Sequence, residues 1–193
     1  MNFYDKSIVF LFLAFSSSSV QSEILEATST VIILQAPPIT AVPNTSHSVQ
    51  SDKIQVFSER QGIVTPNGIP RVVPGTRVNS YFVHYDPVLL PHRGFALDRV
   101  FSPPAKITFS NPIIAIYSAD TELDSTDAIF GSAGAYPGGL FYRGAEGRSN
   151  NDSFSFSGNT LTIHRLFVRD SATEPGADQL RVITATKFQD SAP

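Results

Sequence analysis

The chain has 193 residues, of which 41% are hydrophobic and 16% charged, and its formal net charge is -3. This hydrophobic fraction excludes a disordered chain, and weak acidity without a basic patch argues against a nucleic-acid partner. Cysteine is absent, which excludes disulfides, thiolate metal sites and a cysteine nucleophile. The 15 Phe and 6 Tyr favour strands, while 14 Pro and 12 Gly supply turns, so the composition predicts a β-rich domain.

Residues 1–22 have the three-part layout of a secretory signal peptide. Lys6 precedes an apolar run at 8–15, and Val20 and Ser22 fit a cleavage site after Ser22. The apolar run is too short to span a bilayer, which needs about 20 residues. We therefore expect a secreted, extracellular protein that has no membrane contact after cleavage.

Residues 23–52 are rich in Ser, Thr and Pro and predict a linker or mobile arm. Their one apolar patch, at 31–34, offers an alternative, in which it adds an edge strand to the domain. The domain itself is expected over residues 53–188, with a short tail at 189–193.

Short strands separated by turn residues are predicted throughout this domain. They are expected at residues 54–57, 77–87, 106–110, 113–118, 139–144, both arms of a hairpin at 153–169, and 179–188. Side chains alternate between the two faces of each strand, which places His84 and Asp86 on the same face. Pro112 predicts a bend between two strands, and Gly158-Asn159 predicts the hairpin turn.

About eight strands at this spacing predict an all-β fold, an antiparallel β-sandwich of jelly-roll type. Between the strands, TPNGIP and VPGT supply tight turns. The one helical expectation is a short turn near 125–130, with Ser125 as its N-cap and Gly131 as its stop.

Several of these stretches also resemble a family. RVNSYFVHYDPV, ITFSNPIIAIYSADTELDSTDAIFGSAGAYP, GLFYRG, SFSFSGNTLTI and DQLRVITA, within residues 62–186, are similar in order and spacing to a set of exported bacterial proteins. Many of those proteins carry a C-terminal sorting signal of the Pro-Glu-Pro type. The resemblance implies an extracellular or surface-associated β-domain and implies no catalytic residues. The chain ends in KFQDSAP, without that signal, so we expect release in place of anchoring.

The stretch SADTELDSTDAIFG at 118–131 concentrates negative charge. Its carboxylates are Asp120, Glu122, Asp124 and Asp127. Their spacing begins like an EF-hand loop, but Ser125 stands where glycine is needed and Gly131 where a bidentate glutamate is needed. We favour a structural turn or helix cap with solvated carboxylates. The alternative is a Ca²⁺ site on the rim of the sandwich that uses all four, and catalysis is the least favoured reading.

Two further sets of side chains are candidate sites. His84 and Asp86 lack a G-x-S-x-G nucleophile, and a metal site there would need His92 or His164, so we favour a structural histidine. The tyrosines suggest a sugar-stacking platform, although strand packing is the favoured explanation. They are Tyr81, Tyr85, Tyr117, Tyr136 and Tyr142.

Three functions follow as hypotheses. The first is a secreted non-enzymatic β-domain with a surface, extracellular-matrix or ligand-binding role. The second is a calcium-dependent carbohydrate-binding module, and the third is a glycan hydrolase or lyase on a jelly-roll scaffold. The expected partner is an extracellular polysaccharide or a cell surface, the expected state is a monomer, and no cofactor other than calcium is expected.

Overall fold

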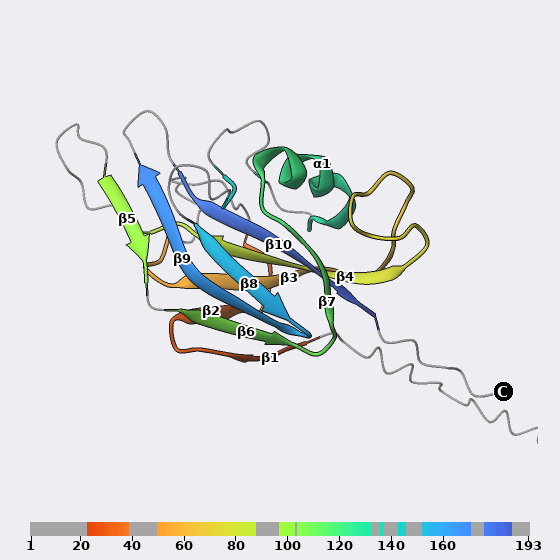
Figure 1. Ribbon diagram of the computed structural model, residues 1–193, viewed down its shortest axis with the longest axis horizontal. Helices are drawn as coiled ribbons and strands as arrows, with labels where there is room; N and C mark the ends of the chain where they lie inside the picture. Colours follow the sequence, from red (N-terminus) through yellow and green to blue (C-terminus); the bar gives the residue numbers. More distant parts are fainter. Residues whose placement is uncertain are drawn as a thin grey trace, which may run out of the picture.

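Ten strands and one helix form a β-sandwich of two five-stranded sheets in the described part of the chain (Figure 1). The structure is a computed structural model. It describes residues 23–38, 50–87, 97–102, 104–132, 136, 143–145, 152–170 and 176–186. The all-β sandwich predicted from sequence is confirmed. The predicted signal peptide and tail lie outside the described residues, as does most of the strand predicted at 139–144.

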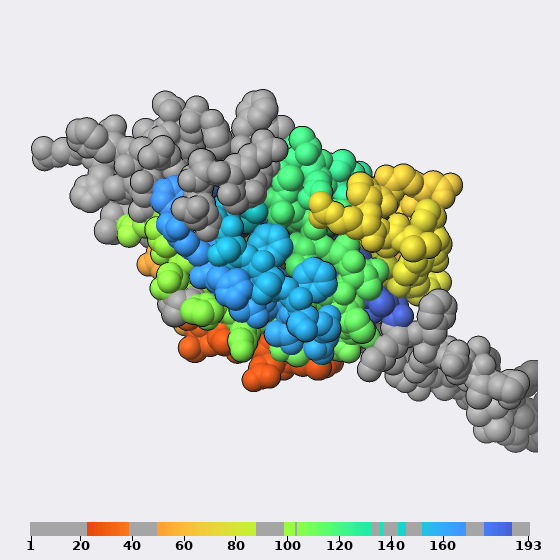
Figure 2. Space-filling view, in the orientation of Figure 1, coloured from red at the N-terminus to blue at the C-terminus, as the bar shows by residue number. Residues whose placement is uncertain are grey.

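The first sheet is built around β9, which pairs antiparallel with β5, β6 and β8, while β1 pairs with β6. The strands of this sheet are β1 (Ile24–Ala27), β5 (Leu97–Phe101), β6 (Ala105–Phe109), β8 (Ser153–Ser157) and β9 (Thr160–Asp170). The predicted hairpin is therefore confirmed as β8 and β9. Its Gly158 has a φ of 58°, a conformation that side chains disfavour. β8 lies at the surface (Figure 2).

The second sheet has the order β2-β3-β4-β10-β7, in which β2 and β3 are parallel and the other pairs are antiparallel. Its strands are β2 (Val31–Leu34), β3 (Ile54–Val64), β4 (Arg77–Tyr85), β10 (Asp178–Ala185) and β7 (Ile113–Tyr117). The structure thus differs from the linker predicted for residues 23–52, since β1 and β2 form there. The apolar patch at 31–34 becomes an edge strand because Val31 is buried and the strand pairs with β3 along its length.

The bend predicted at Pro112 is the point where the chain passes from one sheet to the other. β6, before it, belongs to the first sheet, and β7, after it, belongs to the second. The Pro112 carbonyl accepts a 3.0 Å hydrogen bond from the amide of Ala185, which ties the crossing to the end of β10. A proline suits this position because it has no amide to leave unpaired.

Two apolar cores pack against opposite faces of the second sheet. The core between the sheets contains Tyr81, Val83 and Tyr85 of β4, while Val78 and Phe82 belong to a second core on the outer face. The predicted alternation along β4 is therefore confirmed. The second core is covered by α1 (Asp120–Phe130), whose Leu123 and Phe130 are fully buried. This double coverage explains why β4 and β10 are buried on both faces.

The helix begins earlier than predicted, at Asp120 and with Ala119 as its N-cap, so the expected start at Ser125 is wrong. The carboxylate of Glu122 accepts hydrogen bonds from the amides of Ser118 and Ala119 at 3.3 and 3.4 Å, which stabilises the first turn. The predicted stop is confirmed, because Gly131 is the C-cap. A Cβ at Gly131 would lie only 2.4 Å from the carbonyl oxygen of Asp127.

Truncation of Leu123 tests how strongly α1 depends on its buried face. Because this side chain is fully buried, Leu123→Ala is expected to lower the free energy of unfolding by about 3 kcal/mol. Leu25→Ala is a matched control, since Leu25 is 57% exposed, and it should change stability by less than about 0.5 kcal/mol. Urea unfolding at equilibrium measures both, and equal costs would contradict the packing described here.

Candidate functional site

The four acidic residues predicted as calcium ligands all lie on α1. Asp120 Oδ1 accepts hydrogen bonds from the backbone amides of Arg143 and Gly144, at 2.9 and 2.8 Å. Glu122 forms an ion pair with Arg71 in addition to its contacts with the first helical turn. Both carboxylates therefore hold neighbouring segments of the chain against the helix.

Asp124 and Asp127 belong to an ion-pair cluster between α1 and the second sheet. The members of this cluster are Glu59, Asp124, Asp127, Arg143 and Arg181. Arg143 Nη1 lies 2.6 Å from Asp124 Oδ1 and 2.7 Å from Asp127 Oδ2, and Arg181 Nη2 lies 2.8 Å from Asp127 Oδ1. Both arginine side chains are completely buried. Asp127 thus links two guanidinium groups that have no access to water.

Glu59 supports Arg181 from β3. Its two carboxylate oxygens accept 2.8 Å hydrogen bonds from Nε and Nη2 of Arg181, in a bidentate arrangement. The hydroxyls of Ser80 and Tyr136 each donate a 2.6 Å hydrogen bond to Glu59 as well. Burial lowers the pKa of Arg181, but the nearby Glu59 and Asp127 more than offset this and raise it above its ordinary value. The charged groups of Glu59 and Arg181 are therefore both hydrogen-bonded to several partners.

The calcium hypothesis gains no support from this geometry. Calcium takes six to eight oxygen ligands, whereas the Asp124 and Asp127 oxygens already contact Arg143 and Arg181. Within the described ranges, no three His, Cys, Asp or Glu side chains are grouped so that they would hold a metal ion. Calcium binding stays an untested prediction, and what the carboxylates do in this structure is fasten α1.

The two arginines and Glu59 of this cluster are not predicted by the sequence pattern. Arg181 lies in DQLRVITA, and a charged residue inside such an apolar strand is a signal that a buried partner exists. Arg143 and Glu59 carry no comparable local signal, because their role depends on which segments the fold brings under α1.

Loss of Arg181 should leave Glu59 buried without its counter-charge. Arg181→Met is therefore expected to cost about 3–5 kcal/mol of stability. The double variant Arg181→Met with Glu59→Gln should recover part of this loss, because it removes the unpaired charge.

Arg71→Met provides the comparison, since the Arg71 side chain is exposed and its ion pair with Glu122 is screened by water, and it should cost at most about 1 kcal/mol. Urea denaturation of the four proteins checks the series. A single variant at Arg181 that is no worse than the one at Arg71 would contradict the role of the cluster.

His84 is a buried neutral histidine next to this cluster. Gln179 Oε1 accepts a 2.9 Å bond from Arg143 Nε, so its amide nitrogen faces His84 Nδ1 at 3.1 Å. The ring proton then resides on Nε2, which lies 3.9 Å from Asp86 Oδ2. Burial, with a smaller effect from Arg143, lowers the pKa of His84 to about 4. Arg143 and Gln179 thus orient the ring through Nδ1, while Nε2 has no hydrogen-bond partner among the described residues.

The described geometry does not bring a second histidine to His84. His164 is exposed on the first sheet, where it bonds to the Ser155 hydroxyl, whereas His84 lies on the outer face of the second sheet. His92 lies outside the described residues. The structural reading of His84 therefore has the contacts in its favour.

The lowered pKa of His84 makes stability depend on acidity. The unfolded chain binds a proton below pH 6.5 and the folded chain only near pH 4, so folding loses stability as the pH falls through this window. The loss is on the order of 3 kcal/mol. His84→Gln should remove it, as measured by urea unfolding at pH 7 and pH 4, with His164→Gln as the control for losing a surface histidine. An identical pH dependence in wild type and His84→Gln would contradict this assignment.

The tyrosines considered as a sugar platform are mostly packed away. Tyr81 and Tyr117 are fully buried, and Tyr136 packs against Phe82 while it bonds to Glu59. Tyr142 lies outside the described residues. Tyr85 differs, because it borders a pocket.

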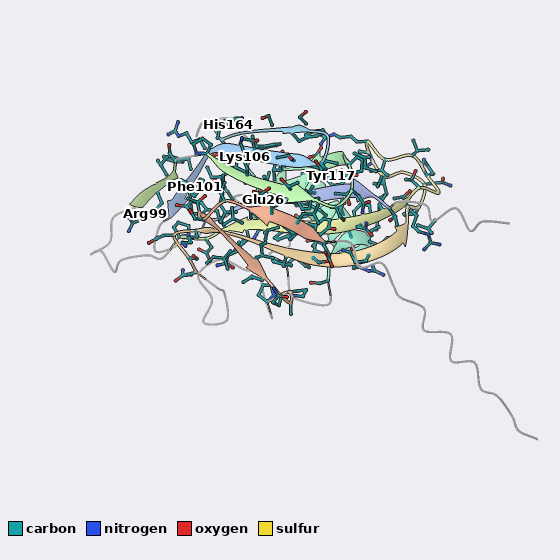
Figure 3. All side chains as sticks on the ribbon, turned by 90° about the horizontal axis from the view of Figure 1, so that it is seen from below. Glu26, Arg99, Phe101, Lys106, Tyr117 and His164 are labelled. Atoms are coloured by element: carbon teal, nitrogen blue, oxygen red, sulfur yellow. The ribbon has the colours of Figure 1, made fainter. Side chains whose placement is uncertain are left out.

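This pocket, the β5 pocket, lies at the end of the sandwich where β4 stops and β5 runs. It has a volume of about 300 Å³, and Arg99 and Phe101 of β5 lie at this end in Figure 3. The remaining walls come from the turn after β1 and from the start of β3. The lining residues are Thr30, Asp52, Lys53, Tyr85, Arg99, Val100, Phe101 and Ser102.

Aromatic packing and charge are combined in this pocket. The rings of Tyr85 and Phe101 meet edge to face, with centroids 5.6 Å apart. Burial, with help from Asp52 and Asp178, raises the pKa of Tyr85 to about 12, and Arg99 opposes this rise. The phenol therefore stays protonated at neutral pH and is able to donate a hydrogen bond.

Asp178 lies directly opposite Tyr85 on β10, and it is almost completely buried. Burial, followed by repulsion from Asp152, raises its pKa well above the ordinary value. Asp178 and Tyr85 therefore both hold their protons more strongly than they would in water. Asp52 is the one carboxylate among the described lining residues, whereas glycoside hydrolysis uses two, so the pocket gives the hydrolase hypothesis no support.

The comparisons with other proteins add no identity. No protein-family model, no curated protein and no solved structure matches the chain. No helix in the described segments has the length and apolar character that a membrane span needs. Any assignment of function therefore depends on the site chemistry.

Proposed function

We propose that this chain is a secreted, non-enzymatic β-sandwich domain that binds a small polar unit of an extracellular saccharide in the β5 pocket. The observation that carries the proposal is the pocket itself, in which charged, hydroxyl and apolar side chains converge. Ligand sites commonly combine apolar walls with a few polar groups that fix orientation.

The size of the pocket favours a small ligand. Its volume of about 300 Å³ is at the low end of the range for ligand sites, roughly 300–1,000 Å³. One sugar ring fits this scale better than an extended oligosaccharide. Thr30 and Ser102 supply hydroxyls, and half-exposed Val100 supplies an apolar surface for the ring face.

The pocket is also held in shape before any ligand arrives. The amide of Ile54 donates to the Thr30 carbonyl at 3.2 Å, and the amide of Ser51 donates to the Asp86 carbonyl at 2.8 Å. These bonds tie the segments beside Asp52 and Lys53 to β2 and β4. A preformed site loses less entropy on binding, which supports a binding role.

The secreted location is supported by the signal-peptide layout of residues 1–22. A surface or matrix setting would supply saccharides at high local density, so weak binding by one small pocket would suffice there.

Obstruction of the pocket tests the proposal. Ser102→Trp places a large ring at an exposed lining position and should abolish retention on the polysaccharides that the wild-type chain binds in a glycan array. Ser157→Trp is the matched control, because this exposed serine lies on β8 and does not line the pocket.

Calorimetry with the best array ligand then gives the affinities of the three proteins. An equal affinity for wild type and Ser102→Trp, or no retention of wild type on any saccharide, would overturn the proposal.

A further inference from the structure

Arg99 is an arginine without an anionic partner in the described structure. Its Nε is buried and has no hydrogen-bond acceptor among the described residues, and its guanidinium forms no ion pair with any of them. Arg143 and Arg181 in the same domain are each paired with carboxylates at 2.6–2.8 Å. A partly buried guanidinium at a pocket wall, left without such a partner, is suited to a ligand anion.

We propose that the ligand of the β5 pocket is an acidic sugar, a uronic acid, whose carboxylate is bound by Arg99. This inference rests on the proposed saccharide-binding function and names the ligand class of the same pocket. Three observations support it. They are the lack of a carboxylate partner for Arg99 among the described residues, the charge balance of the pocket lining, and the hydroxyl groups of that lining.

The charge balance matches one negative charge on the ligand. Arg99 and Lys53 contribute two positive charges to the lining and Asp52 contributes one negative charge, which leaves a net charge of +1. A uronate carries a single carboxylate and would neutralise this excess. The planar guanidinium also matches a carboxylate in a two-bond arrangement, which a lysine ammonium cannot provide.

The Tyr85 hydroxyl adds a hydrogen-bond donor to the pocket and carries no negative charge that would compete with a ligand carboxylate for Arg99. With a pKa of about 12, its hydroxyl is neutral over the physiological range and does not repel a carboxylate. Phe101 packs edge to face against Tyr85, which fixes the ring.

The other lining groups favour a sugar over a simple organic acid. Asp52 is able to accept hydrogen bonds from ring hydroxyls, and Thr30 and Ser102 are able to donate or accept them. Such groups would recognise the neutral part of a uronate, while Arg99 recognises its charged part.

Matched sugars test the inference in the full chain. D-glucuronate and D-galacturonate are compared with D-glucose and D-galactose by calorimetry, at low salt and at physiological salt. We expect each acid to bind at least about tenfold more tightly than its neutral counterpart, a ratio typical of a charge-assisted contact. Added salt should weaken the acids and leave the neutral sugars unchanged.

Variants then assign the effect to Arg99. Arg99→Gln should bring the ratio of the acid affinity to the neutral-sugar affinity close to one, whereas Arg99→Lys should retain part of the preference for the acid. Lys106→Gln is the control, because Lys106 is an exposed cation of the same sheet outside the pocket (Figure 3). Thermal unfolding verifies that each variant is folded.

The outcomes separate this inference from the proposed function. Neutral sugars that bind as tightly as the acids, or a preference that survives Arg99→Gln, would overturn the inference while the saccharide-binding function stands. Inorganic sulfate or phosphate would be expected to bind any cationic site. If either displaces glucuronate at the same concentration as galacturonate does, the assignment of the site to a carboxylate is overturned. Both proposals fail together if none of these sugars binds and if the Ser102→Trp variant is retained on the same array polysaccharides as the wild-type chain.

Discussion

The pairing of Arg181 with Glu59 and Asp127 is the interaction on which the outer half of this fold depends. Arg181 comes from β10, Glu59 from β3 and Asp127 from α1, so one guanidinium joins three elements that are distant in sequence. It also lies over the rings of Phe82 and Tyr136, at 5.3 and 5.4 Å from their centroids. Removal of one partner of this ion pair would leave the other charge buried without a counter-ion. Such a loss costs more stability than the loss of an exposed ion pair.

Charged side chains have different partners on the two faces of the second sheet. On the outer face, Asp124 and Asp127 of α1 pair with Arg143 and Arg181. On the inner face, Tyr85 borders a pocket in which Arg99 has no carboxylate partner among the described residues. The most charged stretch of the sequence therefore fastens α1 in this structure, and the less conspicuous Arg99 is the residue that we propose for recognition.

The strands of the domain could be predicted because alternation is a local property. Along β4, each side chain falls on the face that its position implies, and the hairpin of β8 and β9 follows from Gly158. The extent of α1 could not, since its first turn is stabilised by Glu122 and by contacts with Arg71 and Arg143 from other segments. β2 was anticipated only as an alternative, because its parallel pairing with β3 leaves no turn signal in the sequence.

The pocket could not be found from sequence, because it has no local pattern. Thr30, Asp52, Tyr85 and Arg99 belong to four separate segments, and only the sandwich brings them together. Tyr85 was singled out for its ring, but nothing in the sequence distinguished it from buried Tyr81 or Tyr117. The acids of α1 were visible, whereas their partners were not, since Arg143 and Arg181 lie far along the chain.

The position of β10 delays completion of the second sheet during synthesis of the chain. It is the last strand of the described residues, yet it occupies an inner place between β4 and β7 and carries Arg181. The second sheet therefore cannot close until synthesis has passed Ala185, and the many distant pairings make folding slow. A sheet whose inner strand is made this late stays incomplete through most of the synthesis of the chain.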